Sequence, residues 1–151
     1  MEIYTDGSSI GNNSNKISPG GWAYVVVENE LETFNKCGNK SSATNNEMEL
    51  KAMIEALVYV KFNMIEKCMI YTDSNYVHDG INSWSKRWVK NSFKTSTGKL
   101  IKNVELWKVL IELKGSVSDD VHIKWVKAHD VNKWNNRVDS LARTSAERMK
   151  A

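Results

Sequence analysis

The sequence predicts an α/β protein built on a five-stranded mixed sheet, in which three antiparallel strands are followed by parallel strands and helices cover both faces. The chain opens with three β-rich segments separated by turn signals. Residues 44–64 then repeat apolar side chains at helical spacing, and each later strand follows a helical segment. The resulting order, βββ-α-β-α-α-β-α, is typical of a mixed sheet covered by helices. A length of 151 residues suits one domain, residues 1–151.

The first three strands are expected to form an antiparallel meander. Ile3–Asp6 (IYTD) ends the first strand, and residues 7–19 form a polar loop that holds the only proline. Residues 22–28 (WAYVVVE) are the second strand. A turn at 28–30 leads to residues 31–37, whose alternating pattern indicates the returning arm of a hairpin.

The first helix has both a start signal and an apolar face. Thr44, Asn45 and Asn46 each offer a side chain that can cap its N-terminus. Its apolar positions recur three or four residues apart and therefore share one side: Met53, Ala56, Leu57, Val60 and Met64. Residues 68–72 then form a strand, and residues 75–84 form a short helix.

Two longer helices and one strand complete the predicted fold. Asn103 can cap a helix that stops at Gly115. The inward positions of that helix are Val104, Trp107, Leu110 and Ile111. Residues 121–126 are the last strand. The final helix covers residues 135–149, and its inward positions are Val138, Leu141, Ala142 and Met149.

Charge and cysteine content narrow the class of protein. The net charge is +3, but six basic residues and no acid lie between Gly80 and Val104, so the remaining chain is acidic. A basic segment in an otherwise acidic chain suggests a surface that binds a polyanion, next to a site whose chemistry needs carboxylates.

Cys37 and Cys68 lack metal-ligand spacing, and we expect two reduced, buried thiols in a cytoplasmic protein. No apolar run is long enough to cross a bilayer, so we expect no membrane partner.

The tetrapeptide IYTD occurs twice, at residues 3–6 and 70–73. Because side chains alternate along a strand, Tyr and Asp share one face in each copy. The helix between the copies favours a parallel pair of strands, whose C-terminal ends lie together. Asp6 and Asp73 would then lie at the rim of the sheet, about one strand spacing (~4.8 Å) apart. Open α/β sheets bind ligands at this rim.

Two further acids lie on predicted helices. Glu49 falls on the apolar stripe of the first helix, and Asp139 lies between Val138 and Ala142 at the edge of the inward face of the last. Each acid alone has an ordinary explanation. An Asp at the end of a strand often forms a turn, and a Glu in the first turn of a helix interacts favourably with the helix dipole. An Asp beside an apolar stripe is usually exposed to solvent.

Taken together, the four carboxylates indicate a metal site. Apart from Lys51, which follows Glu49 by two residues, we expect no basic residue beside any of them. Converging carboxylates repel one another unless some are protonated or divalent cations neutralise them. Oxygen ligands favour Mg²⁺, with Mn²⁺ as a substitute. Two such ions about 4 Å apart would promote hydrolysis of a phosphodiester.

The chain resembles type 1 ribonuclease H along nearly its whole length. Seven stretches carry the resemblance in the family's order: YTDGSSIGN, PGGWAYVV, TNNEMELKAMIEAL, YTDSNYVHDGI, KNVELW, WVKAHD and NNRVDSLAR. The resemblance implies a metal-dependent endonuclease that hydrolyses the RNA strand of RNA–DNA hybrids, largely independently of sequence, leaving 5′-phosphate and 3′-hydroxyl ends. It implies that two Mg²⁺ ions are held by Asp6, Glu49, Asp73 and Asp139. We expect the protein to act as a monomer.

The resemblance also implies roles outside the four acids. His129 matches a loop histidine that relays a proton or speeds product release. Positions that match substrate contacts are Asn12, Thr44, Asn45, Asn46 and Asn75. The segment 84–99 matches the basic protrusion of many bacterial members, and its expected contacts are Trp84, Lys86, Arg87, Trp88, Lys90 and Lys94. As alternatives, residues 44–46 can serve as caps, and Trp84 and Trp88 can anchor the segment. Trp107 and Trp125 are expected in the core or the wall.

The chain departs from the family pattern in three places. The loop 11–20 is a few residues longer, Glu47 stands where a basic residue is frequent, and Ala128 and Asp130 replace the usual small neighbours of His129. Competing functions also stay open. One is a relative of the integrases and resolvases that acts on DNA, and another is a hybrid-binding module without activity. A third alternative, a small-molecule phosphatase, is not supported, because the basic stretch is of the kind that binds nucleic acid.

Overall fold

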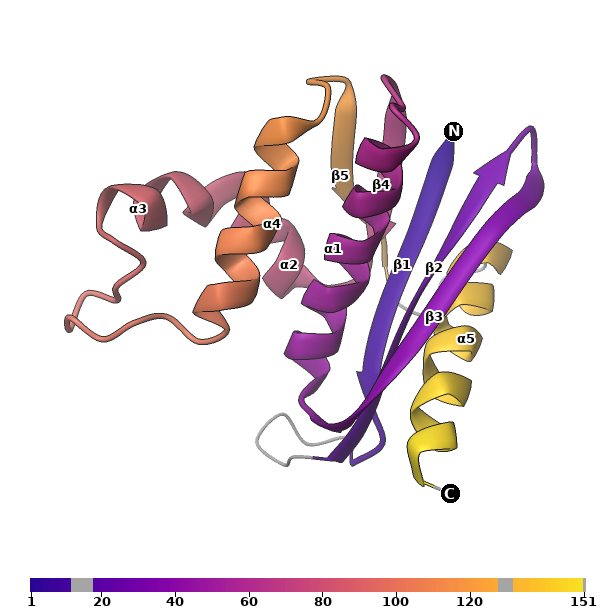
Figure 1. Cartoon of the computed structure of the whole chain (residues 1–151), viewed down its shortest axis with the longest axis horizontal. Helices are drawn as coiled ribbons and strands as arrows, with labels where there is room; N and C mark the ends of the chain where they lie inside the picture. The colour runs from indigo at the N-terminus through magenta and orange to yellow at the C-terminus, as the bar shows by residue number, and fades with distance from the viewer. Residues whose placement is uncertain (12–17, 128–131, 151) are drawn as a thin grey trace.

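Five strands form one mixed sheet in the order β3-β2-β1-β4-β5 (Figure 1). The computed structural model describes residues 1–11, 18–127 and 132–150. The strands are β1 (Glu2–Ser9), β2 (Ser18–Glu28), β3 (Leu31–Ala43), β4 (Cys68–Thr72) and β5 (Val121–Trp125). The first three pair antiparallel, whereas β4 runs parallel to β1 and β5 runs parallel to β4. The predicted fold class is therefore confirmed.

Helices cover both faces of this sheet. They are α1 (Asn45–Phe62), α2 (Asn75–Asp79), the wider helical turn η1 (Gly80–Trp84), α3 (Ser85–Lys90), α4 (Val104–Ser116) and α5 (Lys133–Lys150). Figure 1 shows α1 to α4 on one side of the sheet and α5 on the other. Within the described ranges, no helix combines the length and apolar character needed to span a bilayer.

Two apolar layers hold the helices to the sheet. The larger lies under α1 and α4 and includes Ile3, Val26, Leu57, Ile70 and Trp107. The smaller lies under α5 and includes Tyr4, Val25, Val138 and Ala142. Neighbouring residues of β1 thus point to opposite faces, as the pleat requires. Asp6 is two residues beyond Tyr4 and therefore belongs to the α5 face.

The first three strands are longer than predicted. β1 continues to Ser9 instead of ending at Asp6, because β2 pairs with it as far as Ser9 and Gly20. The ends of β2 and β3 nearest this region extend in the same way. The polar loop predicted for residues 7–19 was therefore wrong at its ends. Small polar residues there are held in strand conformation by cross-strand hydrogen bonds, which local propensity does not reveal.

The helical predictions hold except at several ends. Thr44 caps α1, and its Oγ1 accepts a hydrogen bond of 3.2 Å from the backbone N–H of Glu47. Met64 was wrongly placed on the inward face, because it follows the end of α1 and is 85% exposed. Met149 was also wrong: it is exposed, and the apolar face of α5 continues instead through Ala146.

Two predicted helix boundaries need correction around α4. Asn103 stands at the N-cap position but does not cap the helix, because its φ of 57° is left-handed and its side chain donates to the Tyr76 hydroxyl instead. α4 also passes Gly115 and ends at Ser116. The short helix predicted to end at Trp84 continues through η1 and α3.

The two cysteines are free thiols, as predicted. Cys68 is buried in the larger apolar layer, and burial raises the pKa of its thiol to about 11. Cys37 is only partly buried, which corrects the expectation that both thiols are enclosed.

Candidate active site

The two IYTD copies lie side by side, as the sequence predicts. Ile3 pairs with Ile70 and Tyr4 pairs with Tyr71 in the parallel ladder. The two tyrosine rings stack with their centroids 4.8 Å apart. This register places Asp6, inside β1, beside the residue that directly follows β4, Asp73. The two strands therefore deliver one carboxylate each to the same edge.

A glycine allows Glu49 to reach that edge. The backbone N–H of Gly7 donates a hydrogen bond of 2.6 Å to Glu49 Oε1. A Cβ on Gly7 would lie 2.2 Å from the carbonyl carbon of Met48, inside the first turn of α1. Because no side chain fits there, glycine at this position lets α1 approach β1 closely enough to bring Glu49 beside Asp6.

A second glycine sets the position of the helix that carries Asp139. A Cβ on Gly21 of β2 would lie 2.2 Å from the carbonyl oxygen of Ala142 in α5. α5 therefore packs directly on the backbone of β2 at this point. This close packing brings Asp139 to the cavity that Asp6, Glu49 and Asp73 line.

The acids come together tightly enough to perturb one another. Asp6, Glu49 and Asp73 each offer an oxygen, and these oxygens all lie within 4.8 Å of one another. Burial, the charge of Asp73 and contact with Asp139 raise the pKa of Asp6 well above its usual range. Desolvation and the charges of Asp6 and Asp73 likewise raise the pKa of Glu49. Clustered carboxylates without cations behave in this way, and their hard oxygen donors fit divalent metal ions.

The acids open into a cavity of about 710 Å³ that also presents amide side chains. Three of the residues predicted to contact substrate line it, Asn45, Asn46 and Asn75, whereas Thr44 lies at the start of α1 as its cap. The Oδ1 atom of Asn45 accepts hydrogen bonds from the backbone N–H and the hydroxyl of Ser9, at 2.6 and 3.0 Å. Among the described residues the amide NH₂ of Asn45 has no hydrogen-bond partner, so it can donate to a ligand.

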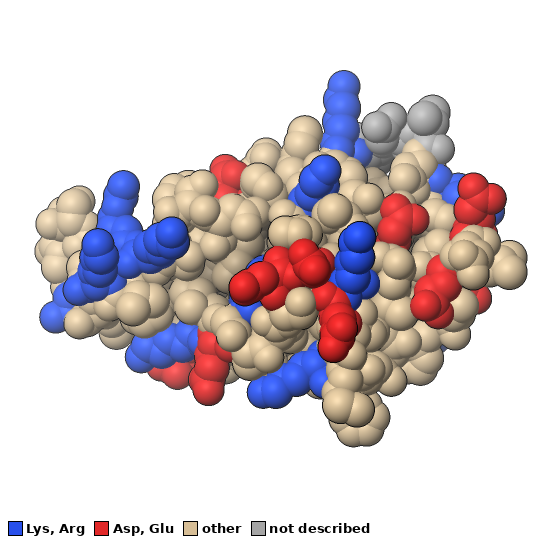
Figure 2. Space-filling model, turned by 90° about the horizontal axis from the view of Figure 1, so that it is seen from above, with Lys and Arg blue, Asp and Glu red and all other residues tan. Residues whose placement is uncertain are grey.

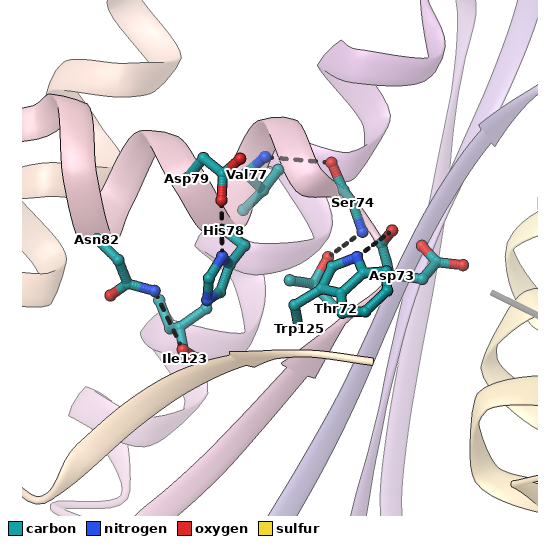
Figure 3. A network of polar contacts seen from close by, with 9 residues as sticks. All are labelled: Thr72, Asp73, Ser74, Val77, His78, Asp79, Asn82, Ile123 and Trp125. Carbon is teal, nitrogen blue, oxygen red and sulfur yellow. Dashed lines mark hydrogen bonds and ion pairs between the residues drawn. The ribbon is translucent and has the colours of Figure 1, made fainter. Parts of the chain in front are cut away.

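The backbone around Asp73 is held on both sides (Figure 3). Trp125 Nε1 donates a hydrogen bond of 3.1 Å to the Asp73 carbonyl oxygen. Ser74 donates its N–H to Thr72 Oγ1, and its own hydroxyl caps α2 by accepting from the N–H of Val77, each at 3.1 Å. Figure 3 shows the Asp73 carboxylate pointing away from these contacts, toward α5. Trp125 supports the Asp73 backbone, but it is 43% exposed and does not line the cavity, so its expected place in the core or the wall is not confirmed.

Comparison with known proteins agrees with this geometry. The family described as RNase H matches residues 1–147. The chain belongs to the ribonuclease H family.

Individual relatives span almost the same length. Ribonuclease H of Pseudoalteromonas atlantica is 45% identical over 148 residues, covering 97% of this chain and 90% of the relative. Ribonuclease H of Rhizobium etli is 42% identical over 152 residues, covering 99% and 93%. Among solved structures, LC9-RNase H1, described as a type 1 RNase H with the type 2 active-site motif, superposes with a TM-score of 0.82 at 25% identity, covering 98% of this chain and 72% of the other.

The part of this ribonuclease H that matches the basic protrusion lies away from the cavity. Figure 2 shows blue side chains gathered at the end of the molecule that carries α3. Lys86, Arg87 and Lys90 of α3 are exposed, as is Lys94 beyond it.

Trp84 and Trp88 anchor this segment to the rest of the protein. Trp88 packs on the buried Trp107, with ring centroids 4.8 Å apart, and Trp84 lies 5.8 Å from Trp88. Trp84 retains 38% exposure, whereas Trp88 is half-buried. Trp107 is a core residue, as predicted.

The ion pairs around the acids differ from the sequence prediction. Asp139 does have a basic neighbour, since Arg143 Nη2 lies 3.0 Å from Asp139 Oδ2, so the prediction that only Lys51 flanks the acids was wrong. Lys51 instead lies 3.7 Å from Glu55. Glu47 forms an ion pair with Lys40, which offsets its charge.

Sequence reasoning missed two charged residues that line the cavity, Arg143 and Glu147. Both lie on α5, four and eight residues after Asp139, and spacing of this kind on a helix predicts a shared face. The same signal that identified Asp139 could therefore have identified them. Asn12, His129, Ala128, Asp130 and most of the loop 11–20 lie outside the described residues.

Proposed function

We propose that this ribonuclease H is an endonuclease that hydrolyses the RNA strand of RNA–DNA hybrids. The observation that carries the proposal is the group of three carboxylates whose oxygens lie within 4.8 Å of one another, with Asp139 on the same cavity. A site of this kind has no evident structural purpose, because it places like charges together at the cost of stability. Relatives named Ribonuclease H at 42% and 45% identity support the same activity.

The residues present fit divalent cations, and we propose Mg²⁺, with Mn²⁺ as a substitute. Asp6, Glu49, Asp73 and Asp139 would hold the ions, since all four offer hard oxygen donors. Two such ions supply the charge that activates an attacking water and stabilises the leaving oxygen, giving 5′-phosphate and 3′-hydroxyl ends. The raised pKa values of Asp6 and Glu49 support this fit. Burial is the larger cause and the charges of neighbouring carboxylates add to it, and a bound cation would offset that repulsion.

Amide groups on α1 and α2 account for recognition of the RNA strand. The Asn45 carbonyl oxygen is already engaged by Ser9, so its NH₂ group is left to donate to a 2′-hydroxyl at the cavity. Asn46 and Asn75 present further amides to the same space. The Thr44 hydroxyl accepts from the Glu47 N–H, and its own hydrogen remains to donate to a phosphate of the DNA strand.

The remaining roles come from the resemblance of sequence. We propose that His129 relays a proton or speeds product release, and that Asn12 contacts the hybrid. The exposed cations of α3 would grip DNA phosphates, which carries no sequence information and makes cleavage largely sequence-independent. Because the family match covers residues 1–147, we propose that the chain acts as one catalytic domain.

The test is cleavage of an end-labelled RNA–DNA hybrid with and without Mg²⁺, beside single-stranded RNA, double-stranded RNA and double-stranded DNA. We expect internal cleavage of the RNA strand in the hybrid alone, and only with the metal. The Asp6→Asn variant should abolish cleavage while hybrid binding in Ca²⁺ persists.

Two other outcomes would overturn the proposal. Cleavage of the DNA duplex in preference to the hybrid would favour a relative of the integrases and resolvases. Tight hybrid binding without any turnover by the wild-type protein in Mg²⁺ would favour a binding module.

A further inference from the structure

The Tyr76 side chain lies where the cavity meets the helices that lead to the basic protrusion, residues 84–99. Tyr76 belongs to α2, and its ring lines the cavity. Its hydroxyl oxygen accepts a hydrogen bond of 2.8 Å from Trp107 Nε1 and one of 3.2 Å from Asn103 Nδ2. The hydroxyl itself donates to the carbonyl oxygen of Lys102 at 3.5 Å. All three partners belong to α4 or to the two residues before it, so one hydroxyl joins α2 to α4.

These contacts occupy the hydroxyl completely. A phenolic hydroxyl has one hydrogen to donate, and its oxygen accepts through its lone pairs. In Tyr76 the hydrogen is engaged and the oxygen already has two donors. The hydroxyl is therefore not available to a substrate in the cavity, and its role is to hold two elements together.

Trp107, the strongest of these partners, also anchors α3. It is fully buried, and its ring centroid lies 5.3 Å from that of Tyr76 and 4.8 Å from that of Trp88 in α3. A Cβ on Gly80, the first residue of η1, would lie 2.0 Å from Trp107 Cη2, so the backbone there packs directly on the indole. A buried indole N–H needs a partner, and among the described residues its acceptor is the Tyr76 hydroxyl.

The position of the protrusion relative to the cavity therefore depends on this contact. α3 carries the exposed cations but has no fully buried side chain of its own, so few contacts hold it to the body of the protein. Phosphate contacts fix the register of a nucleic acid on a protein. A duplex held by α3 keeps a constant offset from the acids only if α3 keeps its place.

We propose that the Tyr76 hydroxyl is a positioning group that sets which phosphate of the RNA strand reaches the acids. It acts through Trp107, by fixing α3 relative to the cavity. This inference rests on the proposed function, because the substrate must be a hybrid that contacts both the cavity and the protrusion. Tyr76 thus links the place where the duplex is held to the place where it is cut.

The experiment compares wild-type protein with Tyr76→Phe, which keeps the ring and removes only the hydroxyl. Both are also made with Lys86→Gln and Lys90→Gln, which remove two cations of α3. An end-labelled hybrid of fixed sequence is cleaved in Mg²⁺, and the fragments, separated to the nucleotide, give kcat/KM and the position of each cut.

Tyr59→Phe is the matched control, because Tyr59 is a partly buried tyrosine that packs on the same apolar layer and does not line the cavity. Circular dichroism and thermal melting check that each variant folds. All assays run below the melting transition of every variant, so that a loss of stability alone leaves the positions of the cuts unchanged.

With the cations in place, Tyr76→Phe should lose about three- to tenfold in kcat/KM, the size of one hydrogen bond. Its cuts should also spread to neighbouring phosphates, because α3 no longer holds one offset from the acids. Without the cations the protein with Tyr76 should already show the spread pattern. Tyr76→Phe should then change kcat/KM by less than about twofold, since the two changes act through one route. Tyr59→Phe should match wild type.

An equal loss in kcat/KM from Tyr76→Phe with and without the cations would overturn the inference, because the hydroxyl would then act independently of the protrusion. A wild-type pattern of cuts in Tyr76→Phe would overturn it as well. Both outcomes leave the proposed function intact, since they presuppose a wild-type protein that cleaves hybrids. Failure of the proposed function would appear differently, as the absence of RNA cleavage by wild type.

Discussion

Replacing Asp6 by Asn is expected to abolish cleavage and, at the same time, to stabilise the metal-free fold. Asp6 is 4% exposed, and its neighbours Glu49 and Asp73 have oxygens within 4.8 Å. At this separation, Coulomb's law puts the repulsion between two ionised carboxylates at about 1 kcal/mol in water and about 3.5 kcal/mol at an effective dielectric constant of 20. Asn has nearly the same shape as Asp and removes the charge.

The effect should depend on pH in a defined direction. Burial, the charge of Asp73 and contact with Asp139 raise the pKa of Asp6 in the folded state. The folded protein therefore binds a proton that the unfolded chain has released, and its free energy of unfolding falls as pH rises from about 4 through the raised pKa. The Asp6→Asn variant does not lose stability in this way, because the Asn side chain does not ionise. The stabilisation by Asp6→Asn should be small near pH 4 and largest above the raised pKa.

The assay is thermal melting in EDTA at several pH values between 4 and 9. Above the raised pKa we expect a gain of about 2 kcal/mol or more, which for a chain of this size raises Tm by about 4–8 °C. Mg²⁺ should raise the Tm of the wild type more than that of the variant, because the cation relieves the same repulsion. Asp119→Asn, at an exposed position away from the cavity, is the control.

A lower Tm for Asp6→Asn in EDTA at pH 8 would refute this reasoning. A difference in Tm that stayed constant across the pH range would refute it as well, because the effect would then not come from the ionisation of Asp6.

Three further perturbations test other parts of the structure. Gly21→Ala should cost about 1–3 kcal/mol and lower kcat/KM, since its Cβ would displace α5; an unchanged melting curve would contradict this. Glu30→Gly should raise stability by about 1 kcal/mol in chemical denaturation, because Glu30 has a φ of 65° in a two-residue turn; a loss of stability would argue against it. Neutralising Lys86, Arg87 and Lys90 should weaken hybrid binding and flatten its salt dependence; an unaltered salt slope in Ca²⁺ titrations would exclude these cations as the grip.

The accuracy of the sequence predictions follows the range of the forces involved. The bounds of β4 were predicted in full, because a short β-rich run between two turn signals is a local pattern. The cap at Thr44 was equally local. The ends of β1 and β2 were missed, since cross-strand pairing holds Gly7 to Ser9 extended. Met64 was misplaced because helical spacing continues on paper after α1 has ended.

The candidate site shows the same division. The repeated IYTD, with its alternating side chains, already placed Asp6 and Asp73 on one face of two neighbouring strands. It could not show that Gly7 and Gly21 admit two helices to backbone contact, which brings Glu49 and Asp139 to the same cavity.

The sequence by itself determined most of the elements that hold the candidate residues and predicted which residues would carry the chemistry, because residue type, periodicity and capping act over a few residues. Tertiary structure alone decided how close the carboxylates lie, how far their burial raises the pKa of Asp6 and Glu49, and that Arg143 stands beside Asp139 in the cavity. The physical reason is that desolvation and charge–charge energies depend on distances through space, and packing of α1 and α5 against the sheet sets those distances.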